Sequence, residues 1–314
     1  MTHTITGKTG LLGLLGDPVA HSLSPQMHNT AFELLGLDYT YLCFQVDELH
    51  LEEAVRGLVA CKIRGFNLTM PNKNKILPLC DELSPAARLT GAVNTVINEN
   101  GRLTGHNTDG CGMIRSLKEA GFPVKGSTIT VMGSGGAASS ICAQAALDGA
   151  EEIHIFARPT SRFWNRTLLL TESLNRSTSC RAFLHEQEDR TALLDSLQKS
   201  QLLLNGTSVG MHPHPEASLI TDPSLLDPHL TVADVIYEPR ETRLLAMARE
   251  QGCKTLNGMY MLLYQGAEAF RLWTGQEMPV EEIKRRFFQS FPKERPEAQI
   301  LYLICASGLS FCSL

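Results

Sequence analysis

Residues 127–138, STITVMGSGGAA, decide the fold of this chain. The β-branched and apolar residues of Ser127–Met132 predict a buried strand, and Ala137–Leu147 predicts a helix. The turn between them fits Gly-x-Gly-x-x-Ala: the first glycine permits a tight turn, the second lets backbone approach a pyrophosphate, and the small last residue lets helix and strand pack closely. The helix N-terminus would face the phosphates. We therefore predict a dinucleotide site that includes Gly133, Ser134, Gly135, Gly136 and Ala137.

Strands and helices continue to alternate after this turn. Strand-like runs lie at Glu152–Ala157, Leu202–Asn205 and Thr231–Ile236, with helical runs at Arg190–Ser200 and Thr242–Gly252. Alternation of this kind is typical of an α/β fold in which a doubly wound parallel sheet carries helices on both faces.

The first hundred residues contain a second set of α/β signals. We predict a helix that begins at Ser24-Pro25 with Ser24 as its cap, an amphipathic helix over Glu48–Leu58, and a hairpin turn near Asn100-Gly101. Strands are predicted at Leu11–Leu15, Tyr39–Val46, Arg64–Leu68 and Gly91–Asn98. Two later helices, Met261–Trp273 and Val280–Phe288, are expected to cross back onto this first half.

Length and composition narrow the class of protein. A chain of 314 residues is long enough for two domains, and 43% hydrophobic with 19% charged residues is ordinary globular composition. A formal net charge of -5 argues against a nucleic-acid partner, so we expect a small molecule.

Cysteine usage and the termini indicate a compartment. The nine cysteines form no Cys-x-x-Cys pair, and Met1–Ile5 lacks the features of a signal peptide, so we expect a reducing cytoplasm. Residues 289–314 form an atypical apolar tail. We interpret it as a segment that packs on the surface or on an oligomer partner rather than as a membrane anchor, which leaves a homodimer open.

The end of the second predicted strand carries basic residues where an acid would mark NAD binding. It reads Ala157-Arg158-Pro159-Thr160-Ser161-Arg162. A guanidinium group matches a phosphate dianion, so Arg158 and Arg162 favour NADP over NAD as cofactor. The alternative is that both arginines are merely solvated.

Two polar motifs contain the candidates for proton transfer. Asn67-Leu68-Thr69-Met70-Pro71-Asn72-Lys73 supplies a lysine, and Asn107-Thr108-Asp109-Gly110 supplies a carboxylate. Lys73 and Asp109 together could handle the proton of a substrate hydroxyl while a hydride leaves the same carbon. Taken alone, Lys73 would instead be a surface lysine after a turn.

These motifs, with others in the same order, resemble the shikimate dehydrogenase family, in its quinate/shikimate dehydrogenase-like branch. The further motifs are Ser22-Leu23-Ser24-Pro25, Gly91-Ala92-Val93-Asn94-Thr95, Asn205-Gly206-Thr207-Ser208 and Gln265-Gly266-Ala267. The resemblance implies a substrate-binding domain of residues 1–108 and 256–288 with a Rossmann-like domain, 109–255, inserted into it. It also implies reversible NADP-dependent oxidation of shikimate to 3-dehydroshikimate, with Lys73 and Asp109 as the catalytic pair.

The resemblance further implies particular binding residues. Substrate contacts are expected from Ser22, Ser24, Asn67, Thr69, Asn94, Gln265 and Tyr237, and cofactor contacts from Thr207 and Gly258 in addition to those above. Two departures from the family pattern stand out: Ala157-Arg158-Pro159 replaces Asn-Arg-Thr, and a bulky Tyr260 replaces a small residue.

Three alternatives stay open at this point. An NAD-dependent quinate dehydrogenase would keep the same chemistry, a ring-amine substrate would need only a variant pocket, and a ligand-sensing relative would have lost turnover. Retention of both Lys73 and Asp109 argues against the sensor. His212-Pro213-His214 suggests a metal, but no further ligand lies at suitable spacing, so we predict no metal site.

Overall fold

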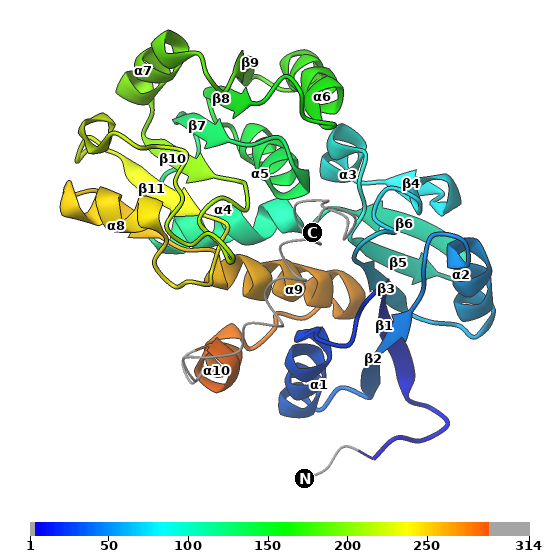
Figure 1. The fold of residues 1–314 in the computed structure, drawn as a ribbon. Helices are drawn as coiled ribbons and strands as arrows, with labels where there is room; N and C mark the ends of the chain where they lie inside the picture. The colour runs from blue at the N-terminus through cyan, green and yellow to red at the C-terminus, as the bar shows by residue number, and fades with distance from the viewer. Residues whose placement is uncertain (1–3, 289–314) are drawn as a thin grey trace. The chain divides into compact units, whose positions relative to one another are not determined.

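The computed structural model describes residues 4–288, which divide into two compact units. Residues 4–108 and 263–288 make up the first unit, and Asp109–Leu262 makes up the second (Figure 1). The chain returns to the first unit within α9 (Met259–Thr274), a few residues later than the expected boundary at 255. The predicted tail, 289–314, lies outside the described residues.

The first unit is built on a mixed sheet with the strand order β2-β1-β3-β5-β6-β4. Its strands are β1 (Gly10–Gly16), β2 (Tyr39–Gln45), β3 (Gly65–Leu68), β4 (Glu82–Leu83), β5 (Thr95–Glu99) and β6 (Arg102–His106). Strand β1 pairs in parallel with β2 and β3, whereas β5 is antiparallel to β3 and β6. The predicted hairpin turn is confirmed: Asn100 and Gly101 have φ angles of 55° and 94°, which suit a tight two-residue turn.

Helices flank this sheet and complete its core. They are α1 (Ser24–Leu35), α2 (Leu51–Ala60), η1 (Leu77–Leu79), α3 (Pro85–Thr90), the later part of α9, α10 (Val280–Ile283) and the π-helical η3 (Lys284–Phe288). The predicted return of the C-terminal helix is confirmed, because Trp273 Nε1 donates to Val96 O at 3.0 Å. A Cβ on Gly65 would lie 2.4 Å from Trp273 Nε1, so only glycine lets α9 pack this closely.

Two local predictions for this unit are wrong. Ser24 does not cap α1: it is the first helical residue, Leu23 occupies the capping position, and the Ser24 N–H donates to Ser22 Oγ at 3.2 Å. The strand predicted from Gly91 begins only at Thr95, because Gly91 adopts the left-handed conformation (φ 57°) that ends α3.

The second unit contains a fully parallel sheet with the order β12-β11-β10-β7-β8-β9. Its strands are β7 (Thr128–Met132), β8 (Glu152–Ala157), β9 (Arg181–Glu186), β10 (Leu202–Asn205), β11 (Thr231–Asp234) and β12 (Lys254–Leu256). Chain order reverses between β7 and β10, the point at which doubly wound sheets bind ligands at their carboxyl ends. The predicted fold class is therefore confirmed.

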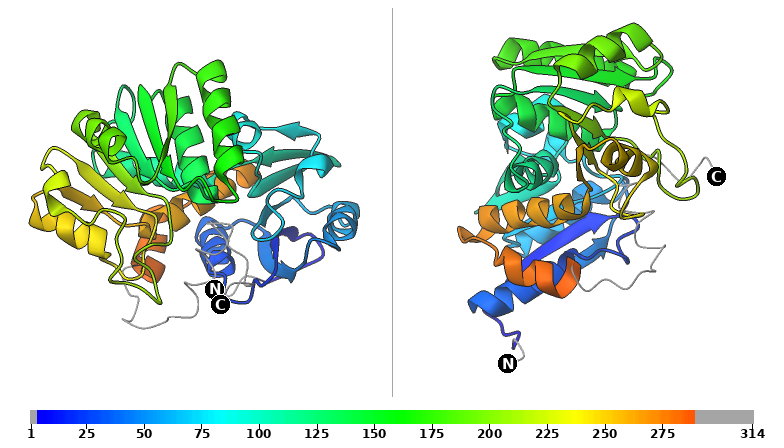
Figure 2. Two further views of the ribbon diagram at one scale, coloured as in Figure 1. Left: turned by 45° about the horizontal axis from the view of Figure 1, so that its top comes forward. Right: turned by 90° about the vertical axis from the view of Figure 1, so that its left-hand side faces the viewer.

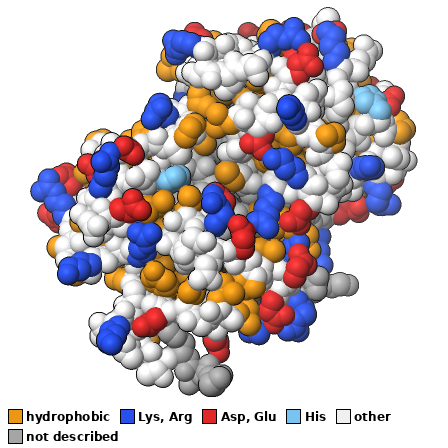
Figure 3. Space-filling model, turned by 180° about the vertical axis from the view of Figure 1, so that it is seen from behind, with side chains coloured by type: hydrophobic (Ala, Val, Ile, Leu, Met, Phe, Trp, Pro, Cys, Tyr) orange, Lys and Arg blue, Asp and Glu red, His pale blue; other side chains and the backbone are white. Residues whose placement is uncertain are grey.

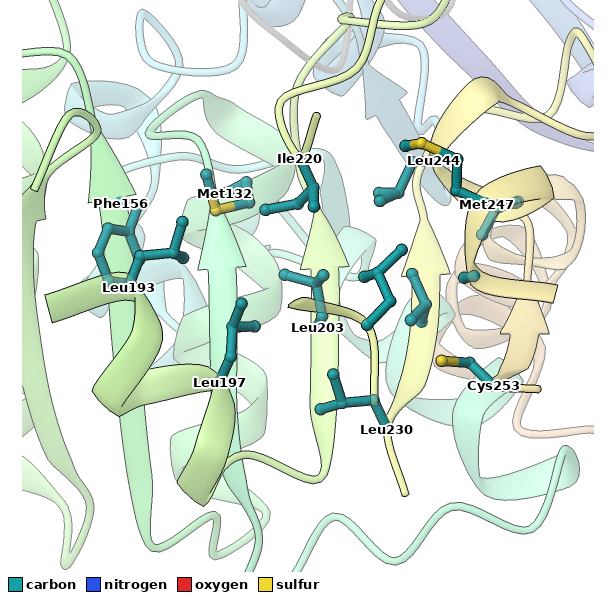
Figure 4. Packing of buried hydrophobic residues seen from close by; sticks show 14 residues of the cluster. Met132, Phe156, Leu193, Leu197, Leu203, Ile220, Leu230, Leu244, Met247 and Cys253 are labelled. Carbon is teal, nitrogen blue, oxygen red and sulfur yellow. The ribbon is translucent and has the colours of Figure 1, made fainter. Parts of the chain in front are cut away.

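Helices lie on both faces of this parallel sheet (Figure 2). They are α4 (Asp109–Glu119), α5 (Gly136–Leu147), α6 (Trp164–Ser177), α7 (Arg190–Lys199), η2 (Pro223–Leu225) and α8 (Arg243–Glu250). On one face, Leu193 and Leu197 of α7 and Leu244 and Met247 of α8 pack over strand residues such as Leu203 (Figure 4). Burial of these apolar side chains stabilises the packing of the helices on the sheet.

The surface combines both signs of charge. Basic and acidic side chains of the described residues are interspersed over the face drawn in Figure 3. Among residues 4–288, no helix has both the length and the apolar character needed to cross a bilayer.

Candidate active site

Two buried asparagines form the centre of the predicted substrate site in the first unit. Asn67, at the end of β3, donates from Nδ2 to Asn94 O at 3.0 Å and to Thr95 Oγ1 at 2.9 Å. Asn94, just before β5, accepts at Oδ1 from Thr95 Oγ1 at 3.0 Å and from the Thr108 N–H at 2.8 Å. These bonds fix the orientation of both amides, which is what recognition of a hydroxylated ring requires.

Gln265 joins the same cluster from α9. Asn94 Nδ2 donates to Gln265 Oε1 at 3.4 Å and to Thr108 Oγ1 at 3.0 Å. Gln265 is only 8% exposed, so its amide is committed to this polar cluster. Three predicted residues, Asn67, Asn94 and Gln265, are thus brought together although they are far apart in sequence.

Ser22 and Ser24 lie beside β2. Ser24 lies near the Tyr41 hydroxyl and Ser22 near the Cys43 thiol, and each opposes the rise that burial causes in the pKa of its neighbour. Tyr41 in turn donates its hydroxyl to Asn67 Oδ1 at 2.7 Å. Burial raises the pKa of Tyr41 well above its usual value, so this hydroxyl stays protonated and acts as a donor.

The turn that carries Thr69 and Lys73 is anchored by backbone bonds. The Thr69 N–H donates to Leu15 O at 3.0 Å, and the Val93 N–H donates to Lys73 O at 2.8 Å. A Cβ on Gly16 would lie 2.2 Å from Thr69 Cγ2, which explains the glycine at the end of β1. Lys73 is half-buried on this turn, whose backbone is fixed by these bonds.

Asp109 follows Thr108 directly and is the first residue of α4 in the second unit. It is 6% exposed, and a carboxylate is favoured at a helix N-terminus. A Cβ on Gly110 would lie 2.1 Å from Ser140 O in α5, so the glycine that follows Asp109 is required for close helix packing.

The glycine-rich turn of the second unit has the geometry of a phosphate-binding loop. Gly133 has φ 112°, and a Cβ there would lie 2.5 Å from Thr207 Cγ2. Gly135 precedes α5 with no side-chain cap, and Gly136 and Ala137 form its first turn, so their amides are available to an anion. Ser134 is buried next to Ser161, with 3.3 Å between the hydroxyls. The residues present fit a dinucleotide.

Thr207 packs against this turn from the end of β10. Its N–H and Oγ1 donate to Asn205 Oδ1 at 3.0 and 2.7 Å, which fixes the strand end across the switch point from Gly133. Gly206 is also required, because a Cβ there would lie 2.7 Å from Ala138 Cβ.

Gly258 lies against the segment that follows β11. Its N–H donates to Ile236 O at 2.9 Å, and a Cβ would lie 1.9 Å from Val235 O, so no other residue fits. Tyr237 does not lie at the end of a strand as predicted, because β11 ends at Asp234. Burial raises the pKa of Tyr237 above its usual value and keeps it protonated.

The two predicted NADP-selecting arginines lie directly after β8. Arg158 O accepts from the Ser161 N–H at 2.9 Å, which closes a turn, and both Arg158 and Arg162 are exposed. The Arg162 guanidinium lies 4.7 Å from the centroid of the Phe163 ring. Sequence reasoning missed Arg166 in the first turn of α6, where burial lowers the pKa of its guanidinium.

Among residues 4–288, no group of three or more potential metal ligands is present. His214 of the rejected motif lies 3.3 Å from Glu216, and both side chains are exposed.

Together, a doubly wound sheet with a glycine-rich turn and a second α/β unit with buried amides define the class of two-domain dinucleotide-dependent oxidoreductases. The chain belongs to the shikimate dehydrogenase family. Residues 14–96 match the family model "Shikimate dehydrogenase substrate binding domain", and residues 258–286 match "Shikimate 5'-dehydrogenase C-terminal domain".

Individual relatives span almost the whole chain. The shikimate dehydrogenase (NADP(+)) of Listeria innocua is 50% identical over 92% of this chain and 99% of its own length. The structure of shikimate 5-dehydrogenase from Listeria monocytogenes in complex with shikimate and NAD has a TM-score of 0.88 at 50% identity, over 91% of this chain and 98% of that one. Quinate dehydrogenase from Corynebacterium glutamicum in complex with NAD has a TM-score of 0.76 at 30% identity, over 88% and 98%.

Proposed function

We propose that this protein catalyses the reversible, NADP-dependent oxidation of the 3-hydroxyl of shikimate to 3-dehydroshikimate. The observation that carries the proposal is the buried cluster of Asn67, Asn94 and Gln265, in a chain that is 50% identical to a shikimate dehydrogenase (NADP(+)) over 92% of its length. Amides and hydroxyls can each donate and accept, which suits a ring that carries three hydroxyls.

In the proposed mechanism, the substrate is held by residues of the first unit. Asn67, Asn94, Gln265, Thr69 and the two serines bind its hydroxyls and carboxylate. Lys73 lies on the turn next to Thr69, so its ammonium can bind the oxygen of the reacting hydroxyl and stabilise developing negative charge there. Tyr237 is an additional proposed contact.

Oxidation requires the hydroxyl proton to leave the oxygen as hydride leaves the carbon. Lys73 and Asp109 are the proposed pair for this proton: the neutral amine of Lys73 or the carboxylate of Asp109 would accept it. Bound NADP⁺ would supply the nicotinamide ring that takes up this hydride.

The second unit would hold the cofactor. The amides of Gly133, Ser134, Gly135, Gly136 and Ala137 would bind the pyrophosphate, with Thr207 and Gly258 alongside. Arg158 and Arg162 would bind the 2′-phosphate that distinguishes NADP from NAD.

The setting of the reaction is also part of the proposal. We infer a cytoplasmic enzyme of aromatic amino-acid biosynthesis with a small-molecule substrate and no nucleic-acid partner, in keeping with a net charge of -5. A homodimer stays a prediction, to be checked by sedimentation.

Oxidation of quinate with NAD is the second candidate function, supported by the structural similarity to an NAD-bound quinate dehydrogenase.

The Lys73→Ala variant tests the proposed chemistry. Shikimate oxidation should fall by about 10²–10⁴-fold while NADP binding persists. Lys75→Ala is the matched control, since Lys75 is an exposed neighbour paired with Glu48 at 3.0 Å, and it should leave turnover unchanged. Near-normal turnover in Lys73→Ala would contradict the assigned role, and binding without turnover in the unmodified protein would favour a ligand sensor.

A further inference from the structure

A fully buried carboxylate lies next to the loops that carry Thr207 and Gly258. It belongs to none of the sequence motifs and has no role in the proposed mechanism. Asp234 is the last residue of β11 and is 0% exposed. Its Oδ1 accepts from the Ile236 N–H at 2.9 Å and from Asn205 Nδ2 at 3.1 Å. Its Oδ2 accepts from Thr242 Oγ1 at 2.8 Å and from Asn205 Nδ2 at 3.2 Å.

The carboxylate helps to fix the orientation of the Asn205 amide. The ionised carboxylate only accepts, so it favours the orientation in which Asn205 points its NH₂ group towards Asp234 and its oxygen towards Thr207, the same orientation that the Thr207 N–H and the Val209 carbonyl require. In that orientation, Asn205 Oδ1 accepts from the N–H and Oγ1 of Thr207 at 3.0 and 2.7 Å. Asn205 Nδ2 also donates to Val209 O at 3.1 Å, which closes the loop around Thr207.

The same carboxylate reaches the loop on the other side of β11. Its bond to the Ile236 N–H anchors the residue whose carbonyl oxygen accepts from the Gly258 N–H at 2.9 Å. Thr242 joins the network and caps α8, because its Oγ1 accepts from the Leu245 N–H at 3.3 Å. One side chain therefore connects the loops that carry Thr207 and Gly258.

Burying this group is costly, so its retention calls for an explanation. Burial raises the pKa of Asp234 to about 7, opposed by the three groups that donate to it. Several donors on one buried carboxylate are typical of groups that hold surrounding elements in a single arrangement.

We propose that Asp234 is a positioning residue for cofactor binding: through Asn205 and Ile236 it sets the geometry of Thr207, and hence of the Gly133 turn, and of the segment against Gly258. The inference rests on the proposed function only in naming NADP(H) as the ligand.

The Asp234→Asn variant tests this inference. An amide offers one acceptor and one donor group where the carboxylate offers two acceptors, so the side chain at this position no longer accepts on both sides, and the bonds that hold Asn205 and, through it, Thr207 are weakened. We expect the Kd for NADPH, measured by fluorescence titration well below the unfolding temperature, to rise at least tenfold. Hydrogen exchange should also speed up at the amides of Thr207 and Ile236 without any cofactor. Shikimate affinity measured without cofactor should stay the same.

Two further variants separate positioning from general loss of stability. Thr130→Val removes another buried hydroxyl of the same sheet, which contacts Ser200 Oγ at 2.8 Å, and should lower stability while the Kd for NADPH stays unchanged. Thr242→Val removes only one donor to Asp234 and should weaken NADPH binding by about threefold, even if Asp234→Asn does not fold.

The outcomes distinguish the two proposals. A Kd for NADPH that stays at the unmodified value in Asp234→Asn and Thr242→Val would overturn the positioning role and leave the proposed function intact. Equal weakening in Thr130→Val would overturn it too, because the effect would then follow from stability alone. Failure of the unmodified protein to bind NADPH would instead overturn the proposed cofactor, while the exchange rates at Thr207 and Ile236 would still test the network.

Discussion

The hydroxyl of Tyr41 donates to Oδ1 of Asn67 at 2.7 Å, which connects a buried aromatic cluster to the proposed substrate residues. The His28 ring lies below Tyr41, with 4.6 Å between the ring centroids, and Phe32, Phe270 and Trp273 surround the histidine. The orientation of Asn67 therefore depends on hydrophobic packing as well as on its polar neighbours.

Replacing Tyr41 with Phe should weaken substrate binding. The change leaves Asn67 Oδ1 without its donor in a buried setting, a loss worth about 1–3 kcal/mol. We expect the KM for shikimate to rise severalfold with little change in the KM for NADP, measured by initial rates. Tyr39→Phe on the same strand is the control, because the Tyr39 hydroxyl has no hydrogen bond to any of residues 4–288. A shikimate KM equal in both variants would contradict the role of Tyr41.

His28 should make the fold sensitive to acid. Neither ring nitrogen has a hydrogen-bond partner among the residues that the structure describes, and burial lowers the pKa of His28 from 6.5 to about 3. As the pH falls, His28 therefore takes up a proton in the unfolded chain at a higher pH than in the folded protein. The free energy of unfolding consequently falls as the pH drops from 6.5 towards 3. The loss between pH 7 and pH 5 should be about 2 kcal/mol.

Urea unfolding at several pH values checks this prediction. In His28→Phe, the free energy of unfolding should lose about 2 kcal/mol less between pH 7 and pH 5 than in the unmodified protein. Substitution of the exposed His21 should leave this loss unchanged. The aromatic neighbours of His28 include one other titratable group, Tyr41, which stays neutral in this range because burial raises its pKa. The same pH dependence in His28→Phe and the unmodified protein would show that His28 is not the responsible group.

The two arginines after β8 should select the cofactor. In Arg158→Gln with Arg162→Gln, the KM for NADP should rise at least tenfold and that for NAD by less than twofold, because only NADP carries the 2′-phosphate. Arg190→Gln removes an exposed arginine that pairs with Asp222 at 3.2 Å, and it serves as the control. Equal losses with both cofactors would mean that the arginines do not recognise this phosphate.

Gly133→Ala should abolish tight NADP binding. The substitution introduces a Cβ that would lie 2.5 Å from Thr207 Cγ2, on a residue with φ 112°. Gly121→Ala is a matched control for backbone strain, because Gly121 has φ 83° but nothing within 4 Å of its Cβ position. If both variants bind NADP equally well, steric fit at the Gly133 turn is not what forms the site.

Local signals in the sequence were sufficient for much of the fold. The strand before Gly133 and the helix after it are where their residue pattern predicts them, since apolar periodicity and turn glycines act over short distances. The edge strands β9 and β12 were not predicted: β9 alternates in burial and includes the exposed Phe183, and β12 has only three residues. Helix α6, with its exposed Leu168 and Leu169, was missed as well.

The site was less predictable than the fold. Motif residues such as Asn67 and Asn94 could be named in advance, but their partners could not, because Tyr41 is joined to Asn67, and Thr108 to Asn94, only by tertiary contacts. Asp234 lies in an apolar run that reads as an ordinary strand. Nothing in that run indicates that three groups donate hydrogen bonds to this carboxylate. The donors are brought to it only by the packing of β10, β11 and α8 in the folded protein.

The measurement that tests the account most directly is a comparison of kcat/KM for shikimate and quinate, each with NADP and with NAD, on one preparation of purified protein. We expect kcat/KM for shikimate with NADP to exceed that of each other combination by at least tenfold. A preference for quinate with NAD would contradict the proposed substrate and the role of Arg158 and Arg162, and absence of turnover in all four combinations would contradict the proposed function itself.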